Sequence, residues 1–252
     1  MKIGAQLFTV RDFTQTLDDL ALTFKKVASI GYRVVQVSGT CAFGAEWMDE
    51  QLKKNGLTCA ITHTNADRVT NETDRVIAEH KIFGCPVIGI GAAPGPLDCP
   101  ADIDAFAARF LPAAHRIKEA GLVFAYHNHN HEFSKLNGIT IMEALANAFP
   151  SDVMDFTLDT YWIQAGGGDS AEWISKLAGR VRNVHLKDMV IADHEQRMAP
   201  VGSGNMNFPA ILNACADAGT QYLLVEQDDC YGENPFDCLA QSYKYLKAQG
   251  LN

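Results

Sequence analysis

The chain has 252 residues, of which 47% are hydrophobic and 20% are charged, and its formal net charge is −9. This composition is typical of a soluble globular protein with a large core, and an acidic chain without a long basic run argues against a surface that follows nucleic-acid phosphates. No stretch of the sequence approaches the roughly 18 apolar residues of a membrane span. We therefore expect neither a nucleic acid nor a membrane as a partner.

The seven cysteines form no CxxC pair and are odd in number. A disulfide framework is therefore not expected, and a reduced compartment is the simpler interpretation. The first residues, Met-Lys-Ile-Gly-Ala-Gln-Leu, are typical of a strand and not of a signal peptide. These features predict a cytoplasmic protein.

Short apolar runs recur along the chain, and most are rich in β-branched or aromatic residues and too short for helices. They predict eight strands: Lys2–Leu7, Arg33–Val37, Thr58–Thr62, Val87–Ile90, Val123–His127, Met154–Leu158, Val181–Leu186 and Tyr222–Glu226.

The segments between these runs carry apolar residues at helical spacing. The first such face ends before Gly31, which suits a helix stop, and consists of Leu17, Leu20, Phe24 and Val27. A later face contains Pro112, which is expected to kink or break the helix, and consists of Ile103, Phe106, Phe110 and Ile117.

Strands that alternate with helices indicate right-handed βαβ units and a parallel sheet. Eight such units in 252 residues favour a closed (β/α)8 TIM barrel, an α/β fold, over an open doubly wound sheet. We expect one barrel domain over residues 1–252. Because no GxGxxG follows the first strand, a dinucleotide-binding fold is disfavoured.

Active sites of such barrels lie at the carboxyl ends of the strands, where four late strands end in polar groups. The fifth strand leads into His127, His129, His131 and Glu132; the sixth ends at Asp159; the seventh ends at His185, Lys187 and Asp188; the eighth ends at Glu226, Asp228 and Asp229. Carboxylates with one or two imidazoles suit Mn²⁺, Mg²⁺, Co²⁺ or Zn²⁺. Strand alternation places the apolar neighbours of these residues on the opposite face, toward the helices.

Each residue also has a structural interpretation. An aspartate at a strand end often caps the next helix, and a single histidine is more often structural than a ligand; it is their occurrence on successive strands that favours one metal site. Gln6, Gln36 and His63 end the first three strands and are candidates for substrate binding, the glutamines alternatively for hydrogen bonding at the barrel mouth. His131 is expected in solvent, as are His80, His115 and His194. The glycine turn at 166–168 is interpreted as a loop in which Asp169 caps the next helix.

Four segments together resemble a known family: Tyr126-His-Asn-His129-x-x-Glu132-Phe, Leu158-Asp159-Thr, Gly179-Arg-Val-x-x-Val-His185-Leu-Lys187-Asp188 and Val225-Glu226-Gln-Asp. They resemble the sugar phosphate isomerase/epimerase group of the xylose isomerase-like barrel superfamily, which also includes inosose dehydratase and endonuclease IV. The opening Gly4-x-Gln6-Leu-x-Thr9-Val-Arg11-Asp12 is similar to the same group. The resemblance therefore spans nearly the whole chain, and it also implies a homodimer.

The resemblance implies one divalent metal ion held by Glu, Asp, His and Glu from strands five to eight, which here are Glu132, Asp159, His185 and Glu226. Glu132 is the nearest carboxylate to the end of strand five, where His127 or His129 could substitute for it. Gln36 departs from the Glu often found at the end of strand two.

The function implied is a metal-dependent isomerase or epimerase that acts on a sugar, keto-sugar or cyclitol through an enediolate. Glu226 is a candidate base, His127 or His129 could transfer the second proton, and Lys187 could hold a substrate oxygen. Three alternatives stay open: a lyase acting on a keto-inositol or 3-keto-glycoside, a phosphodiesterase like endonuclease IV, which the net charge and ligand count disfavour, and a non-catalytic sugar-binding barrel. Phosphorylated substrates are not expected, because no glycine-rich loop followed by lysine is present.

Overall fold

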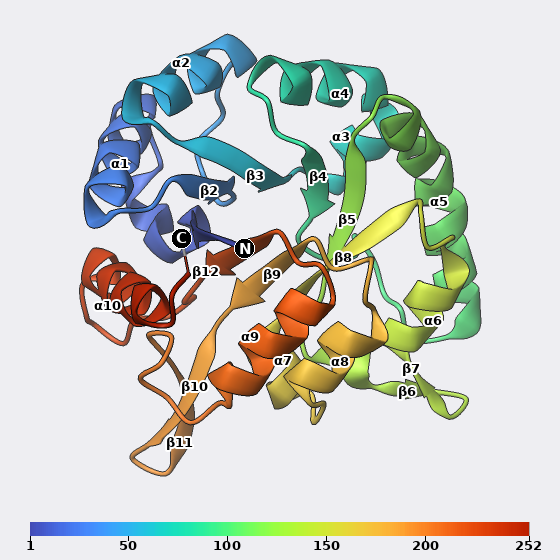
Figure 1. Cartoon of the computed structure of the whole chain (residues 1–252). Coiled ribbons are helices and arrows are strands. Elements are labelled where there is room, and N and C mark those ends of the chain that lie inside the picture. The colour runs from blue at the N-terminus through green and yellow to red at the C-terminus, as the bar shows by residue number, and fades with distance from the viewer. Residues whose placement is uncertain (252) are drawn as a thin grey trace.

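The computed structural model, which describes residues 1–251, is a closed barrel of eight parallel strands surrounded by helices (Figure 1). The order around the barrel is β1-β12-β9-β8-β5-β4-β3-β2. The strands are β1 (Lys2–Gln6), β2 (Val34–Val37), β3 (Thr58–His63), β4 (Val87–Ile90), β5 (Val123–His127), β8 (Met154–Asp159), β9 (Asn183–Leu186) and β12 (Tyr222–Val225). The prediction of a (β/α)8 barrel is confirmed, and each of the eight predicted strands is present with ends that differ by two residues at most.

Helices follow the barrel strands and cover their outer face (Figure 1). They are α1 (Leu17–Ile30), α2 (Ala45–Asn55), α3 (Ala66–Asn71), α4 (Thr73–Ile82), α5 (Pro100–Glu119), α6 (Ile141–Ala148), α7 (Thr160–Ala165), α8 (Ser170–Lys176), α9 (Phe208–Asp217) and α10 (Pro235–Ala248), with short 3₁₀ helices at η1 (Leu7–Phe13) and η2 (His131–Phe133). Gly31 ends α1 with a φ of 128°, as the sequence predicts. Asp169 caps α8 by accepting a hydrogen bond from the amide of Glu172, also as predicted.

Pro112 does not break α5, which continues through it to Glu119. A proline inside a helix leaves the carbonyl four residues earlier without its amide donor. Here that carbonyl belongs to Ala108, and both Ala108 and Pro112 are exposed. Water can therefore satisfy the carbonyl, so the predicted break does not occur.

His80 is buried and not on the surface, so that expectation was wrong, whereas His115 and His194 are exposed. The His80 ring lies between Thr62 Oγ1, 2.8 Å from Nε2, and the Val76 carbonyl, 2.7 Å from Nδ1. Thr62 belongs to β3, so one hydrogen-bond partner of His80 comes from outside its own helix. The spacing of residues along the helix alone therefore does not predict that His80 is buried.

Two small hairpins extend the barrel at its carboxyl end. The first pairs β6 (Lys135–Leu136) with β7 (Ile139–Thr140), and the second pairs β10 (Asp188–Ala192) with β11 (Glu195–Ala199). The β10–β11 hairpin projects away from the barrel (Figure 1), and β10 contacts α7. Among residues 1–251, no helix combines the length and the apolar character needed to cross a membrane.

A separate small core fills the interior of the barrel, and all of its members lie on strands: Val34, Ala60, Ile61, Val87, Ala125 and Leu224. Leu158, Val184, Leu186 and Val225 belong instead to the larger core shared with the helices. Because side chains alternate along a strand, Glu226 lies on the same face as Leu224, toward the interior. Strand alternation therefore aims the polar groups at the strand ends into the barrel mouth.

Candidate metal centre

Asp159, His185 and Glu226 meet at the carboxyl ends of three neighbouring strands. Asp159 ends β8 and pairs in register with His185 of β9, and Glu226 directly follows β12. His185 Nδ1 lies 2.8 Å from Glu226 Oε2 and 3.7 Å from Asp159 Oδ2. The structure thus brings together three of the four residues that the resemblance proposes as ligands.

These three side chains fit a divalent cation. Asp159 and His185 are fully buried, and Glu226 is 4% exposed. One donor atom from each lies within 4.8 Å of the others, and Asp159 Oδ2, His185 Nδ1 and Glu226 Oε2 have no aligned hydrogen-bond partner among the described residues. These atoms form ion-pair contacts with one another and with Lys187 instead, and a carboxylate–imidazole set that converges on one point suits Mn²⁺, Mg²⁺, Co²⁺ or Zn²⁺.

Two glutamines orient these ligands. His185 Nε2 donates to Gln36 Oε1 at 2.7 Å, and Gln36 Nε2 donates to Ser38 Oγ at 3.1 Å. The other nitrogen of His185, Nδ1, therefore faces the two carboxylates. Gln6 Nε2 donates to Glu226 Oε1 at 3.0 Å. From the sequence, Gln6 and Gln36 are candidates for substrate contacts. In the structure they hydrogen-bond the candidate ligands Glu226 and His185, and such second-layer hydrogen bonds fix the orientation of metal ligands.

Lys187 supplies a positive charge to the same point. Its Nζ lies 3.0 Å from Asp159 Oδ2, 2.9 Å from Glu226 Oε2 and 2.8 Å from Asp228 Oδ2. Burial lowers the pKa of Lys187, but the three carboxylates outweigh it and raise that pKa above its ordinary value. The ammonium is therefore charged, and the cluster accommodates a cation.

The charged groups in this cluster shift one another's pKa values. Burial raises the pKa of Glu226, but Lys187 and His185 outweigh it and hold that pKa well below its usual range. Burial lowers the pKa of His185, and the attraction of Glu226 and Asp159 reverses this to a net increase. Burial and the Glu226 charge raise the pKa of Asp228 to about 6, against the opposing effect of Lys187. Asp228 follows strand eight in the sequence, but sequence reasoning gave it no role.

Two further imidazoles line the centre. The His127 ring lies 4.5 Å from that of His185 and 5.2 Å from that of His63, measured between centroids. His127 Nδ1 donates to the Thr157 carbonyl at 3.2 Å, which leaves Nε2 as the ligating or basic atom. Burial and the neighbouring imidazoles lower the pKa of His127 well below its usual value and that of His63 to about 3. Both rings are therefore neutral near pH 7.

Glu132 lies in a different group, with His129 and His131. Its Oε1 accepts from the Tyr126 hydroxyl at 2.5 Å and lies 3.1 Å from His131 Nε2, and its Oε2 accepts from the His129 amide at 2.8 Å. Both carboxylate oxygens thus hold the turn that follows β5. The structure groups His127, and not Glu132, with His185.

Comparison with known proteins gives the family. The model of the xylose isomerase-like TIM barrel family matches residues 24–249, whereas a comparison with curated protein sequences gave no match. A sugar phosphate isomerase/epimerase from Parabacteroides distasonis is similar in structure, with a TM-score of 0.83 and 23% identity over 98% of this chain and 93% of that one.

Two more distant structures share the fold. A D-allulose 3-epimerase from a Methylomonas species has a TM-score of 0.73 and 12% identity, covering 99% of this chain and 98% of its own. A probable 3-DHS dehydratase from Bacillus anthracis has a TM-score of 0.71 and 15% identity, covering 98% and 99%. At these identities the structures show the fold alone, but the family model spans most of the sequence: the chain belongs to the xylose isomerase-like TIM barrel family.

Proposed function

We propose that this protein is a metal-dependent isomerase or epimerase that moves a proton next to the carbonyl of a sugar, keto-sugar or cyclitol. The observation that carries this proposal is the convergence of Asp159 Oδ2, His185 Nδ1 and Glu226 Oε2 at the mouth of the barrel. All three are buried atoms that can ligate a metal, and none makes a hydrogen bond of good geometry within the described residues. The structural neighbours support it, because two of them are named as a sugar phosphate isomerase/epimerase and a D-allulose 3-epimerase.

We assign one divalent ion, Mn²⁺, Mg²⁺, Co²⁺ or Zn²⁺, to Asp159, His185 and Glu226, with His127 as the fourth ligand. His127 is preferred to Glu132 because its ring neighbours that of His185 and its Nδ1 is anchored on a carbonyl, whereas both oxygens of Glu132 are engaged elsewhere. When bound, such an ion polarises a carbonyl and stabilises the negative charge of an enediolate.

Proton transfer is assigned to Asp228 and His129. In the barrel order β12-β9-β8-β5, the segment after β12 that carries Asp228 and the segment after β5 that carries His129 flank the two strands that end at His185 and Asp159. The side chain of Asp228 is 23% exposed, so substrate can reach its carboxylate. The Nδ1 of His129 has no hydrogen-bond partner within residues 1–251, so this atom can bond a substrate. Acid–base groups on opposite faces of a carbon are what epimerisation requires. Lys187 donates a hydrogen bond to a substrate oxygen in this scheme.

A lyase is the alternative, since the same groups also support loss of a β-hydroxyl. After a proton is removed next to the carbonyl, an acid must protonate the departing hydroxyl, and the buried ammonium of Lys187 or an imidazole such as His129 can donate that proton. The two reactions differ in their products, so one assay separates them.

The decisive experiment is elemental mass spectrometry of protein purified without chelator, followed by a screen for deuterium exchange next to carbonyls across sugars, keto-sugars and cyclitols. About one equivalent of metal per chain is expected in the parent, lost in Asp159→Ala and His185→Ala because each removes a ligand. His115→Ala is the matched control, because His115 is exposed.

Each outcome assigns a function. Exchange with retention of all oxygens supports the isomerase or epimerase, and an unsaturated product supports the lyase. Two or three zinc ions per chain would favour a phosphodiesterase. Absence of metal after attempted reconstitution with all four ions would contradict the proposal and favour a non-catalytic sugar-binding barrel.

A further inference from the structure

A cavity of about 330 Å³ lies beside the candidate metal centre. The loop between β2 and α2 forms one wall and residues 62–65 at the end of β3 form another, with Arg68, Glu79 and His80 closing the far side. Its size falls within the roughly 300–1,000 Å³ of typical small-molecule sites. Apart from His63 and Ser38, none of its lining residues belongs to the site described above.

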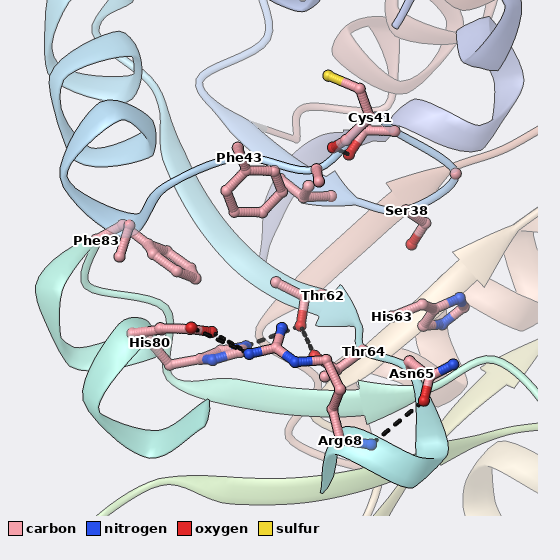
Figure 2. A pocket seen from close by; sticks show the side chains of 16 residues that line it. Ser38, Cys41, Phe43, Thr62, His63, Thr64, Asn65, Arg68, His80 and Phe83 are labelled. Atoms are coloured by element: carbon pink, nitrogen blue, oxygen red, sulfur yellow. Dashed lines mark hydrogen bonds and ion pairs between the residues drawn. The ribbon is translucent and has the colours of Figure 1, made fainter. Parts of the chain in front are cut away.

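The cavity borders the metal centre. His63 is part of its wall, and the His63 ring lies 5.6 Å from that of His185 and 5.2 Å from that of His127. Ser38 is also part of the wall and is bonded to Gln36, which in turn holds His185. Figure 2 shows His63 and Ser38 on one side of the cavity and Phe43 and Phe83 on the other. His63 therefore borders both the cavity and the candidate metal centre, so a ring bound in the cavity would be the neighbour, across His63, of a ring bound at the metal.

The cavity offers no free charge to a ligand. Among its lining residues Arg68 is the only Lys or Arg, and both Glu79 oxygens accept from its Nη2, at 3.0 and 2.9 Å. Burial lowers the pKa of His80 to about 4, so this imidazole is neutral near pH 7. A phosphate or carboxylate would find no unpaired cation here, and specific anion sites usually supply one.

The walls instead combine aromatic rings with short polar groups. Phe43 and Phe83 pack edge to face, with centroids 6.3 Å apart and planes at 79°. Thr64, Asn65 and Thr40 also face the cavity, and Thr64 Oγ1 lies 2.8 Å from Thr62 Oγ1. Apolar surface with a few hydroxyl and amide groups suits an uncharged ring that has one apolar face and polar edges.

We propose that this cavity binds a second, uncharged ring of the substrate, so that the substrate is a glycoside or disaccharide and not a free monosaccharide or a sugar phosphate. The proposal rests on the proposed function, since it places the reacting ring at the metal centre. The second ring packs on Phe43 and Phe83, beside the hydroxyls of Thr62 and Thr64.

The test compares affinities by isothermal titration calorimetry. The probes are α- and β-methyl and phenyl glycosides of glucose, galactose, mannose and xylose, together with glucose 6-phosphate. At least one phenyl glycoside is expected to bind about tenfold more tightly than its methyl counterpart, the ratio given by one added aromatic contact.

Two variants test whether the tighter binding of the phenyl glycoside depends on this cavity. Ala42→Trp adds a large ring at an exposed lining residue, and Phe43→Ala removes the aromatic wall. Each should reduce the phenyl-to-methyl ratio to about one while leaving the affinity for the methyl glycoside and the metal content unchanged. The control is Phe13→Ala, because Phe13 also packs edge to face on another phenylalanine, Phe236, but lies outside the cavity.

Three results would overturn the inference: no phenyl glycoside preferred over its methyl counterpart, a preference that both variants retain, or tighter binding of glucose 6-phosphate that Arg68→Ala removes. A protein that binds metal and exchanges protons but shows no such preference keeps the proposed function and loses this inference. A protein without metal whose preference depends on Phe43 keeps this inference and loses the proposed function.

Discussion

Lys187 is the buried cation that balances the carboxylates at the barrel mouth in the absence of a metal. Its Nζ contacts Asp159, Glu226 and Asp228 at 2.8–3.0 Å, and its side chain is 2% exposed. Lys187→Met would leave these negative charges facing one another, and the unbalanced burial is expected to reduce the free energy of unfolding of the metal-free protein by roughly 3 kcal/mol or more. Added Mn²⁺ should restore much of this loss, because it supplies the missing positive charge. Chemical denaturation with and without Mn²⁺ measures both effects.

The control is Lys118→Met. Lys118 also pairs with an aspartate, Asp152, but its side chain is 44% exposed, and exposed pairs contribute about 1 kcal/mol at most. Equal losses of stability in the two variants, or a loss in Lys187→Met that Mn²⁺ does not reduce, would contradict the placement of Lys187 within the metal centre.

His80 predicts a dependence of stability on pH that is independent of the metal. Burial lowers its pKa from 6.5 to about 4 in the folded protein. Between these values the unfolded chain binds a proton that the folded chain does not, so the free energy of unfolding falls as the pH falls from 6.5 toward 4, by up to about 3 kcal/mol from this residue. His80→Gln removes the titrating group. Between pH 7 and pH 4 the parent should therefore lose up to about 3 kcal/mol more of its free energy of unfolding than the variant does, as measured by urea denaturation.

His115→Gln is the matched control, since His115 is exposed and its substitution should leave the parent curve unchanged at every pH. Other buried imidazoles, such as His63, also lower stability in acid, but they are common to parent and variant. A difference between parent and His80→Gln that stays constant from pH 7 to pH 4 would disprove the assignment to His80.

Asp188, the first residue of β10, joins the β10–β11 hairpin to the loop that follows it. Its carboxylate accepts hydrogen bonds from the amides of Gly202 and Gly204, each at 2.9 Å, and from those of Met189 and Met206 at 2.8 and 3.2 Å. Asp188→Asn should reduce the free energy of unfolding by about 3 kcal/mol, because the side-chain NH2 of asparagine cannot accept the backbone amide hydrogen bonds that one carboxylate oxygen accepts in this buried position. Hydrogen exchange should also increase across 188–206 more than in the barrel strands.

The comparison for this prediction is Asp193→Asn. Asp193 lies at the tip of the same hairpin, and its side chain is 82% exposed, so exchange in the segment should stay as in the parent. If Asp188→Asn also leaves exchange unchanged, the hairpin does not depend on the Asp188 carboxylate.

At the level of elements, the sequence predicts the barrel strands but not the hairpins. Buried strands consist of apolar runs, which is why all eight are found with ends that differ by two residues at most. The β10–β11 hairpin is largely solvent-exposed, with Ile191 at 62% exposure, and no alternation of polar and apolar residues distinguishes it from a loop. Its pairing depends on tertiary contacts such as those of Asp188.

The candidate site also divides into residues that the sequence predicts and residues whose position only the structure gives. Residues at strand ends, such as Asp159 and His185, come together because the parallel register brings the strand ends to one edge. Glu132 lies five residues beyond the end of β5, where a 3₁₀ turn directs it toward Tyr126. No periodicity predicts such a turn, so the identity of the first ligand depends on the structure.

At the scale of the whole molecule, the candidate metal centre joins strands that are far apart in sequence. Asp159, His185 and Glu226 come from β8, β9 and the end of β12, and β12 closes the barrel against β1. A ligand that binds only the folded chain stabilises it by mass action, so metal bound here is expected to stabilise the entire barrel. A free metal concentration 100 times the Kd adds about 2.7 kcal/mol to the free energy of unfolding, which corresponds to a rise of roughly 5–10 °C in Tm for a chain of this size.

Removal of metal with EDTA should lower the Tm of the parent by this amount in differential scanning calorimetry, and Mn²⁺ or Zn²⁺ should restore it. Asp159→Asn should show the same Tm with and without EDTA, because it lacks one ligand, whereas the exposed-site variant Asp193→Asn should respond as the parent does. A parent whose Tm is insensitive to both EDTA and added metal would contradict a metal centre at these three strands.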